Sequence, residues 1–386
     1  MLLRALQTTL EERRERGLLR TLIQETEPIP ATAVDLSSND YIGLARDAGL
    51  EAAINAEAQR LGKEGTLLLG ATGSRLLTGD SAYARLVESE LAAFHDEESA
   101  LLFNSGYDAN LSVFSCLPQQ GGVVLFDELM HASCREGLKL CRSKTREFKH
   151  NDLARLEEAL HEECDGVKVV LVAIESVYSM DGHLAPVQAM CALAQKYGAE
   201  LIVDEAHGTG VYGPQGRGLC QAKNCRPFAR VHTFGKAVGG HGAVVVGPPA
   251  LRLYLLNYAR PLIFSTALST HSLVAIRASY QYMATVADER QRKLAALVEV
   301  FQREVARLGI SAAHSPSPIQ AIFVPGNDVV VKAAKQLRGR GFWVLPIRAP
   351  SVPAGLERIR VVLHSYNTAD DVVRFVGAVQ VVLGAQ

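Results

Sequence analysis

The chain has 386 residues, of which 48% are hydrophobic and 21% are charged. This composition is typical of a globular protein, so it excludes a disordered chain and allows a large core with a second, smaller domain. Lys and Arg number 40 against 41 Asp and Glu, and this balance argues against nucleic acid or a membrane surface as the main partner.

The first twenty residues, MLLRALQTTLEERRERGLLR, place apolar residues at helical spacing among many charges. This pattern predicts a surface helix rather than a signal peptide or a membrane span, in a cytoplasmic protein. The seven cysteines are scattered and lack C-x-x-C spacing. They therefore predict neither a disulfide framework nor a zinc site, but small buried side chains in a reducing compartment.

From about residue 80 onward, helix-like and strand-like segments alternate. The predicted helices are SAYARLVESELAAFH, capped by Asp80 or Ser81, then GYDANLSVFSCL, HASCREGLKLC and PVQAMCALAQKYG. The predicted strands are ALLF, GGVVLF, VKVVLVAIE and AELIVD. Continuous apolar runs separated by helices indicate a mostly parallel sheet covered on both faces, so the sequence predicts an α/β domain.

The C-terminal part of the chain has a different pattern. Long helical stretches are predicted around residues 270 to 308, followed by strands in IQAIFVPG, GFWVLPI and RIRVVL and by helices near 328–339 and from 368. This mixture predicts a small α+β unit. We therefore expect an N-terminal helix and arm over 1–45, a large α/β domain over 46–290, and a small C-terminal domain over 291–386.

Polar residues follow the predicted strands, at the edge where open parallel sheets bind ligands. These residues are Asn104, Ser105, Gly106, Tyr107, Asp127, His131, Glu175, Ser179, Asp204, His207, Thr233 and Lys236. In addition, residues 206–287 contain no Asp or Glu but eight Lys or Arg. That stretch favours an anionic ligand such as a phosphate or a carboxylate.

Two nucleotide-binding alternatives are weaker. GTGVYG, with Gly208, Gly210 and Gly213, matches the G-x-G-x-x-G pattern of NAD-dependent dehydrogenases, but GPQGRG continues it as a turn. The acid-free stretch also lacks the carboxylate that binds the ribose about 20 residues further on. LIVDEAH resembles a helicase strand end, but no P-loop pattern accompanies it.

A pyridoxal phosphate site needs a lysine for a Schiff base, an acid to pair with the pyridinium nitrogen, a flat partner for the ring and a phosphate cradle. The sequence offers Lys236 in TFGKAVGG, Asp204 at the end of a buried strand, and His131 and His207 as ring partners. Residues 105–107 begin a predicted helix, whose free N–H groups and dipole suit a phosphate.

The chain resembles the α-oxoamine synthases over nearly its full length. These pyridoxal phosphate enzymes have the fold-type I architecture, with a large, mostly parallel sheet domain and a smaller α+β domain, and they condense an amino acid with an acyl thioester. The motifs that carry the resemblance are SSNDYIGLA, GATGSRLLTGD, LFNSGYDAN, MHASCREG, ESVYSMDGHLAP, VDEAHGTGVYGPQGRG, TFGKAVGGHGA, FSTALS and PIRAPSVPAGLERIRVVL.

The resemblance implies roles for individual residues. Lys236 would bind the cofactor covalently and carry the α-proton, Asp204 would pair with the ring nitrogen, His207 would bond its phenolic oxygen, and His131 would stack on the ring. The phosphate would be held by Ser105, Gly106, Tyr107 and Thr233, joined by Ser265 or Thr266 of a second subunit. Glu175 and Ser179 would line the cofactor pocket, and Asn39 and Arg360 would bind the amino acid carboxylate.

Some of these positions have a second reading. Arg360 also fits the exposed face of a strand, Tyr107 a core position, and Ser179 a turn. Ser351 in APSVP stands where the family often has Thr and keeps the hydroxyl, so it could contact substrate. An N-terminal arginine often credited with binding the distal carboxylate of the acyl chain has only a shifted counterpart, Arg20.

Within the family, GATGSRLLTGD and PIRAPSVPAG favour the branch that condenses L-alanine with a pimeloyl thioester of CoA or acyl carrier protein, in biotin biosynthesis. Branches that use glycine or serine with other acyl groups remain alternatives. The resemblance also implies a homodimer, because the active site would be completed across a symmetric interface. No metal, nucleic acid or membrane partner is expected.

Overall fold

The computed structural model describes residues 1–20, 22, 28–117, 121–164, 166 and 169–384. Contacts divide the chain into two compact units. The larger comprises residues 39–295 and 364–366, and the smaller comprises residues 1–38, 296–363 and 367–386. The domain boundaries expected near residues 45 and 290 stay predictions.

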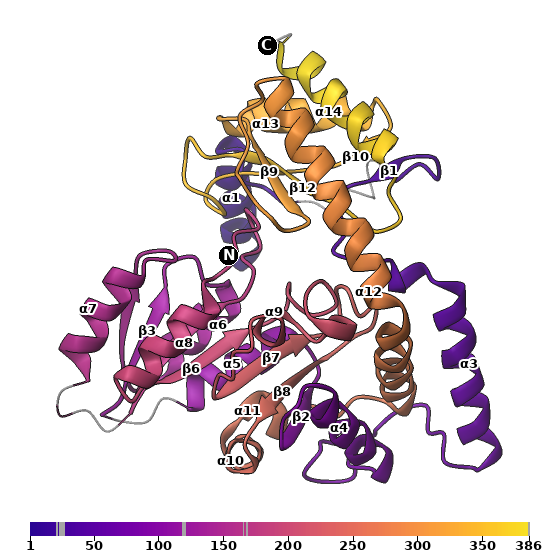
Figure 1. The fold of residues 1–386 in the computed structure, drawn as a ribbon, viewed down its shortest axis with the longest axis vertical. Helices are drawn as coiled ribbons and strands as arrows, with labels where there is room; N and C mark the ends of the chain where they lie inside the picture. Colours follow the sequence, from indigo (N-terminus) through magenta and orange to yellow (C-terminus); the bar gives the residue numbers. More distant parts are fainter. Residues whose placement is uncertain (21, 23–27, 118–120, 165, 167–168, 385–386) are drawn as a thin grey trace. The chain divides into compact units, whose positions relative to one another are not determined.

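A seven-stranded sheet forms the centre of the larger unit, in the order β2-β8-β7-β6-β5-β3-β4 (Figure 1). Strands β4, β3, β5, β6 and β7 run parallel, whereas β8 is antiparallel to both β7 and β2. The predicted α/β class with a mostly parallel sheet is confirmed. The strands are β2 (Ser99–Phe103), β3 (Val123–Asp127), β4 (Lys144–Phe148), β5 (Val170–Glu175), β6 (Glu200–Asp204), β7 (Ala229–Thr233) and β8 (Ala243–Gly247).

Helices pack on this sheet because its central strands are apolar on both faces. All six residues of β5 are buried. Along that strand, Val172 joins one core cluster with Leu156 and Met190, whereas its neighbour Ala173 joins the other with Val113. Successive side chains of a strand point to opposite faces, so the two clusters mark the two covered sides of the sheet.

The helices of the larger unit begin close to their predicted capping residues. The Ser81 side chain accepts the backbone N–H of Ala84 at 3.0 Å and caps α4. The α-helices are α3 (Ala48–Lys63), α4 (Ala82–Phe94), α5 (Gly106–Cys116), α6 (Ala132–Leu140), α7 (Leu153–Glu163), α8 (Val187–Lys196), α9 (Leu219–Ala222), α10 (Pro249–Tyr258) and α11 (Arg260–Ile263), with a 3₁₀ turn η1 (Leu44–Arg46).

The glycine-rich segment after β6 does not open a dinucleotide-binding helix. Residues 206–211 form turns, and a bend at 212–213 leads into the 3₁₀ turn η2 (Pro214–Gly216). Gly210 and Gly213 adopt φ values of 78° and 77°, a left-handed conformation that glycine adopts without strain. The expected absence of a nicotinamide fingerprint helix agrees with this geometry.

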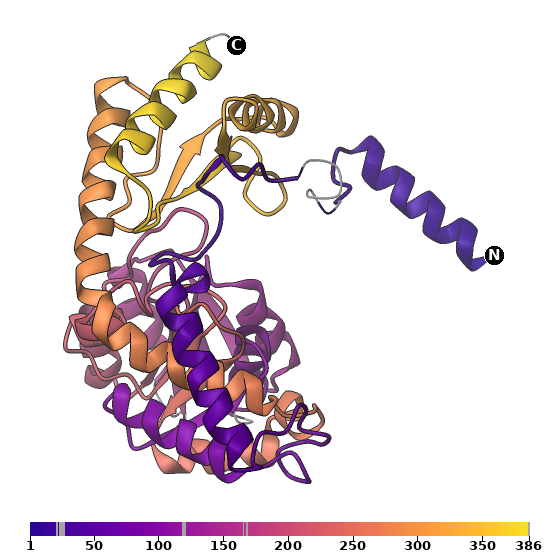
Figure 2. The ribbon, with the colours of Figure 1, turned by 90° about the vertical axis from the view of Figure 1, so that its right-hand side faces the viewer.

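The smaller unit holds a three-stranded antiparallel sheet, β11-β12-β9, and the parallel pair β1-β10. Phe342 of β10 packs edge-on against Phe375 of α14, the yellow helix in Figure 2. The α+β prediction is confirmed for these strands. The elements are α1 (Leu2–Glu15), β1 (Val34–Asp35), β9 (Ile319–Phe323), α13 (Asn327–Arg338), β10 (Phe342–Trp343), β11 (Leu345–Ile347), β12 (Arg358–Val362) and α14 (Ala369–Gly384).

Four further sequence expectations can be compared with the structure. Helix α1 buries none of its residues, as a surface helix should. All seven cysteines are free. Among the described residues, none of the helices combines the length and apolarity needed to cross a membrane. The division between the two units falls inside α12 (Thr270–Arg307), the long helix predicted around 270 to 308.

Candidate active site

A pocket of about 250 Å³ lies at the carboxyl ends of the parallel strands in the larger unit. It gathers most of the residues that the sequence places after those strands, as expected for an open α/β sheet. The pocket is lined by Ser105, Gly106, Tyr107, Asn110, His131, Ser133, Glu175, Asp204, Ala206, His207, Thr233, Gly235, Lys236, His241 and Gly242.

Lys236 ends a chain of polar contacts. Its Nζ lies 2.8 Å from Nε2 of His207, whose Nδ1 lies 2.6 Å from the hydroxyl of Tyr41. That hydroxyl donates in turn to Oδ1 of Asn39 at 3.2 Å. Lysine, histidine and tyrosine are all groups that can exchange protons, so this chain connects the predicted covalent residue to its surroundings by groups suited to acid–base chemistry.

Asp204, at the end of β6, is fixed by two hydrogen bonds. Its Oδ1 accepts the backbone N–H of Ala206 at 2.8 Å, and its Oδ2 accepts Nδ2 of Asn110 at 2.7 Å. The same amide donates to Oγ of Ser133 at 3.0 Å, and this hydroxyl contacts Nδ1 of His131 at 2.7 Å. The predicted ring-nitrogen partner and the predicted stacking residue therefore belong to one hydrogen-bonded network.

His131 is held in its neutral form by its surroundings. Burial lowers the pKa of its ring, and the nearby Lys236 adds to this effect although the Asp204 carboxylate opposes it. Its Nδ1 accepts the backbone N–H of Ser133 at 3.2 Å. A neutral, flat imidazole at the pocket wall is suited to stack on an aromatic ring.

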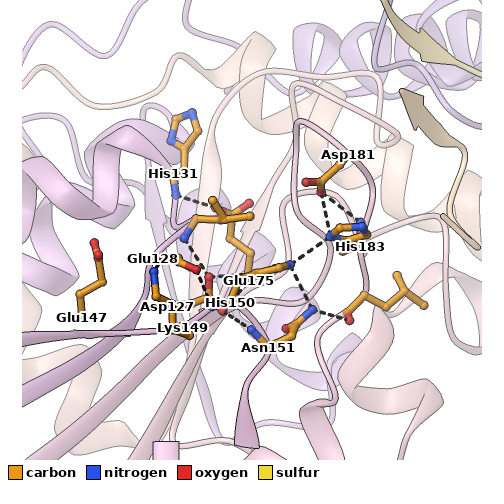
Figure 3. Close-up of polar contacts among 12 residues, drawn as sticks. Asp127, Glu128, His131, Glu147, Lys149, His150, Asn151, Glu175, Asp181 and His183 are labelled. Atoms are coloured by element: carbon orange, nitrogen blue, oxygen red, sulfur yellow. Dashed lines mark hydrogen bonds and ion pairs between the residues drawn. The ribbon is translucent and has the colours of Figure 1, made fainter. Parts of the chain in front are cut away.

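Glu175, at the end of β5, is 3% exposed. Burial raises the pKa of its carboxyl well above the ordinary value, and the neighbouring Asp204 raises it further. One carboxyl oxygen accepts the backbone N–H of His131 at 2.5 Å (Figure 3). Glu175 thus fixes the backbone at the point where His131 enters the pocket.

A second polar cluster supports the same loop (Figure 3). The fully buried Asp127 accepts Nδ1 of His150 at 3.0 Å and the backbone N–H groups of Leu129 and Asn151. Glu128 accepts the backbone N–H of His150 at 3.0 Å. Residues 127–131 are therefore tied to residues 149–151 by several hydrogen bonds, and this restricts the movement of His131.

The N-terminus of α5 lies in the pocket, where the sequence predicts an anion cradle. Ser105 caps this helix by accepting the backbone N–H of Asp108 at 3.0 Å. A Cβ atom added to Gly106 would lie 2.3 Å from Cγ2 of Thr233, so only glycine allows this approach. The buried Oγ1 of Thr233 has no hydrogen-bond partner among the described residues. A phosphate oxygen at this helix end would supply that partner.

Several predicted residues lie elsewhere. Ser265 and Thr266 line a neighbouring pocket of the larger unit with Arg75 and Asn104, and Asn104 donates to the Thr266 carbonyl at 2.8 Å. Ser179 lies in the turn between the bridged residues 177 and 184 and does not line the main pocket. Asn39 does not line the main pocket, but it accepts a hydrogen bond from Tyr41, whose hydroxyl contacts His207.

Three predicted substrate residues belong to the smaller unit, so they are described within it. Arg360 is on β12, opposite Leu345 of β11. Arg20 and Ser351 line one pocket of about 410 Å³, together with Arg13 and Arg348. The structure thus brings the shifted N-terminal arginine and the retained hydroxyl of APSVP to one cationic pocket.

The acid-free stretch does not act as a general anion site. Among its eight basic residues, only Lys236 lines the main pocket. Arg217, Arg230, Arg252 and Arg277 instead pair with acids from other parts of the chain. The inference from that stretch was therefore wrong for these arginines, because the sequence does not show which distant carboxylates meet them.

Sequence reasoning did not identify four residues of the site: Tyr41, Asn110, Ser133 and His241. All four lie inside quoted motifs, SSNDYIGLA, LFNSGYDAN, MHASCREG and TFGKAVGGHGA, and Asn110 is one helical turn beyond Gly106. That spacing could have placed Asn110 on the same helix face. Nothing comparable marks Tyr41, whose contact with His207 spans 166 residues.

The fold and the pocket define a transferase with the fold-type I architecture of pyridoxal phosphate enzymes. Residues 31–378 match the profile of the family "Aminotransferase class I and II". The chain belongs to this family, and the predicted resemblance to α-oxoamine synthases is confirmed by the relatives described next.

Two curated relatives have the same name. The 8-amino-7-oxononanoate synthase of Emericella nidulans is 40% identical over 367 residues, which cover 89% of this chain and 88% of the relative. The 8-amino-7-oxononanoate synthase of Klebsiella pneumoniae is 37% identical over 346 residues, with coverages of 89% and 88%.

Solved structures agree with the fold. A serine palmitoyltransferase from S. paucimobilis superposes with a TM-score of 0.87 at 27% identity, covering 99% of this chain and 97% of the neighbour. The 8-amino-7-oxononanoate synthase of Francisella tularensis has a TM-score of 0.77 at 26% identity, with coverages of 92% and 99%.

Proposed function

We propose that this chain is an 8-amino-7-oxononanoate synthase. It condenses L-alanine with a pimeloyl thioester of CoA or acyl carrier protein, and so takes part in biotin biosynthesis. A bond forms between the alanine α-carbon and the thioester carbonyl carbon, the thiol leaves, and the alanine carboxylate departs as CO₂. The observation that carries the proposal is the pocket in which Lys236, His207, Asp204 and His131 meet, together with 40% identity to a relative of that name.

Pyridoxal 5′-phosphate fits the residues of this pocket. The N-terminus of α5 and Thr233 would hold the phosphate, because that helix end offers N–H groups and Thr233 has an unpartnered hydroxyl. Asp204 would face the ring nitrogen, and Lys236 would bind the aldehyde carbon. When bound, the cofactor supplies an electron sink that stabilises negative charge on the α-carbon of the amino acid.

The chain's own residues would handle the protons. The Lys236 amine is the base that removes the alanine α-proton and later returns a proton to the product, with His207 at 2.8 Å to orient it. Asp204, held by Asn110 and the Ala206 N–H, would keep the ring nitrogen of the bound cofactor protonated. The neutral His131 ring would limit the position of the reacting groups by stacking.

The substrate carboxylates require cations. We assign Arg360 and Asn39 to the carboxylate of alanine. The pocket lined by Arg13, Arg20, Arg348 and Ser351 would bind the distal carboxylate of the pimeloyl chain, because guanidinium groups recognise carboxylates in a bidentate manner. An acyl chain without a distal charge, such as palmitoyl, would leave these arginines without an anion, so the pocket favours a dicarboxylic acyl group.

The other members of the family remain the alternative class of function. They would use glycine or serine, or another acyl group, at the same pocket. A nicotinamide-dependent dehydrogenase is not supported, because turns follow Gly208, Gly210 and Gly213 where a helix is required. We also propose a cytoplasmic homodimer in which Ser265 or Thr266 of the second subunit joins the phosphate.

The experiment is a substrate screen with the protein reconstituted with pyridoxal phosphate. L-Alanine, glycine and L-serine are each combined with pimeloyl-CoA, acetyl-CoA and palmitoyl-CoA, and the products are identified by mass spectrometry. We expect 8-amino-7-oxononanoate from L-alanine and pimeloyl-CoA, and its loss in Lys236→Ala. Productive turnover with glycine or serine instead would retain the family and contradict the proposed substrates.

A further inference from the structure

Tyr41 is a buried tyrosine whose hydroxyl is directed at the active-site histidine. Its side chain has 0% exposure, and its hydroxyl lies 2.6 Å from Nδ1 of His207. We propose that Tyr41 is a positioning residue that fixes the orientation and the tautomer of His207 against Lys236. The contact between Tyr41 and His207 is present in the structure whatever reaction the protein catalyses. Only the expected effect on the reaction rate rests on the proposed function.

The hydrogen bonds of this chain have directions that can be assigned from both ends. Lys236 as an ammonium group has only N–H donors, so Nε2 of His207 must accept at 2.8 Å. At the other end, Oδ1 of Asn39 is an acceptor, and the Tyr41 hydroxyl donates its single proton to it at 3.2 Å. The Tyr41 oxygen is then left to accept.

His207 therefore carries its proton on Nδ1 and donates it to Tyr41. In this tautomer each donor of the chain meets an acceptor, from Lys236 through His207 and Tyr41 to Asn39. The opposite tautomer would place an N–H of His207 against an N–H of Lys236, which costs a hydrogen bond in a buried site. Tyr41 thus acts together with Lys236 to favour the tautomer whose Nε2 can take a hydrogen bond from the lysine.

Tyr41 is itself held in place. The backbone N–H of Ser365 donates to its carbonyl at 2.8 Å, and its ring meets His207 edge-on at a centroid distance of 6.0 Å. A rigid partner limits the swing of the imidazole, and a small displacement of a catalytic group reduces rate strongly. Tyr41 also connects His207 to Asn39, which we assign to the substrate carboxylate.

The first experiment uses the protein without cofactor. Histidine labelled with ¹⁵N reports which ring nitrogen carries the proton, and the His207 signals are assigned by their loss in His207→Asn. We expect Nδ1–H in the wild type and a shift toward Nε2–H in Tyr41→Phe, which removes only the hydroxyl. The matched control is Tyr280→Phe, another buried tyrosine, whose hydroxyl contacts His95 at 3.2 Å outside the pocket.

An Nε2–H tautomer in the wild type would overturn the proposal without any variant. An unchanged His207 tautomer in Tyr41→Phe, or an equal change in Tyr280→Phe, would also overturn it. These outcomes do not depend on the reaction, so they are distinct from a failure of the proposed function.

The second experiment measures the consequence in the reconstituted enzyme. We expect kcat with L-alanine and pimeloyl-CoA to fall by up to about a hundredfold in Tyr41→Phe, as for a misplaced catalytic group, with a smaller change in KM. Tyr280→Phe should retain the wild-type kcat. A Tyr41→Phe enzyme with unchanged kcat would contradict the positioning role even where the tautomer had shifted.

Discussion

Gly106, at the N-terminus of α5, leaves no room for a side chain in the proposed phosphate site. A Cβ atom there would lie 2.3 Å from the methyl carbon of Thr233. We predict that Gly106→Ala weakens binding of pyridoxal phosphate by about fivefold to 150-fold, because overpacking costs about 1–3 kcal/mol. The dissociation constant is measured by titrating the cofactor absorbance into the cofactor-free protein.

The matched control for this prediction removes the atom that clashes. Thr233→Ser deletes the methyl group and keeps the hydroxyl, so the double variant with Gly106→Ala should recover most of the lost affinity. If the double variant binds as weakly as Gly106→Ala alone, the contact with Thr233 is not the cause of the loss.

At the scale of single residues, the sequence located the groups that follow a buried strand. Asp204 and Thr233 could be placed because the carboxyl ends of parallel strands meet at one edge. The residues that act through another side chain could not, since their contacts join distant parts of the chain. Asn110 meets Asp204 across 94 positions, and Tyr41 meets His207 across 166.

Two histidines meet where the end of α4 packs on β7. The rings of His95 and His232 stack at a centroid distance of 3.7 Å, and both side chains are 0% exposed. Burial lowers the pKa of each well below its ordinary value, and the neighbouring Arg230 lowers it further. Both rings are therefore neutral in the folded protein at neutral pH.

This contact predicts a loss of stability in mild acid. The unfolded histidines take up protons below about pH 6.5 whereas the folded ones resist, so the free energy of unfolding falls as pH decreases from that value. Each histidine contributes a slope of up to about 1.4 kcal/mol per pH unit. Urea unfolding of the cofactor-free protein between about pH 8 and pH 5 measures this slope.

His232→Asn tests the assignment of that slope. The Thr209 hydroxyl donates to the Glu205 carbonyl at 2.7 Å and so accepts from Nδ1 of His232 at 2.8 Å. Asparagine can keep a donor for this oxygen, but it does not titrate. The acid slope should become shallower by up to about 1.4 kcal/mol per pH unit. The matched control is His161→Asn, the same substitution at an exposed histidine.

At the scale of elements, apolar runs and capping residues were enough to place most helices and strands. Strands β4 and β8 and helices α3, α7 and α10 were not predicted. In β4 the alternation in KTREF leaves only Phe148 buried. An edge strand with charged side chains does not have the continuous apolar run of a central strand. The antiparallel direction of β8 also depends on contacts with β7 and β2 that local sequence does not show.

At the scale of the whole molecule, the larger unit leaves apolar side chains in water near its second pocket. Leu77 is 78% exposed and Phe264 is 72% exposed. Their loops are connected, because the backbone N–H of Ala267 donates to the carbonyl of Gly73 at 2.9 Å. Exposed apolar groups on neighbouring loops are typical of a surface that another chain covers.

We predict that Leu77→Asp converts a dimer of this chain into monomers. A charge at a covered apolar position must be desolvated on association, which weakens the interface. Light scattering should give twice the 41.7 kDa of the chain for the wild type and for Val381→Asp, a control on α14 that is 58% exposed.

The monomeric variant should also bind pyridoxal phosphate more weakly, because Ser265 and Thr266 would no longer reach the phosphate of the other subunit. A Leu77→Asp variant that stays dimeric would show that this surface is not the dimer interface. A monomeric variant with wild-type cofactor affinity would show that the second subunit does not contribute to the phosphate site.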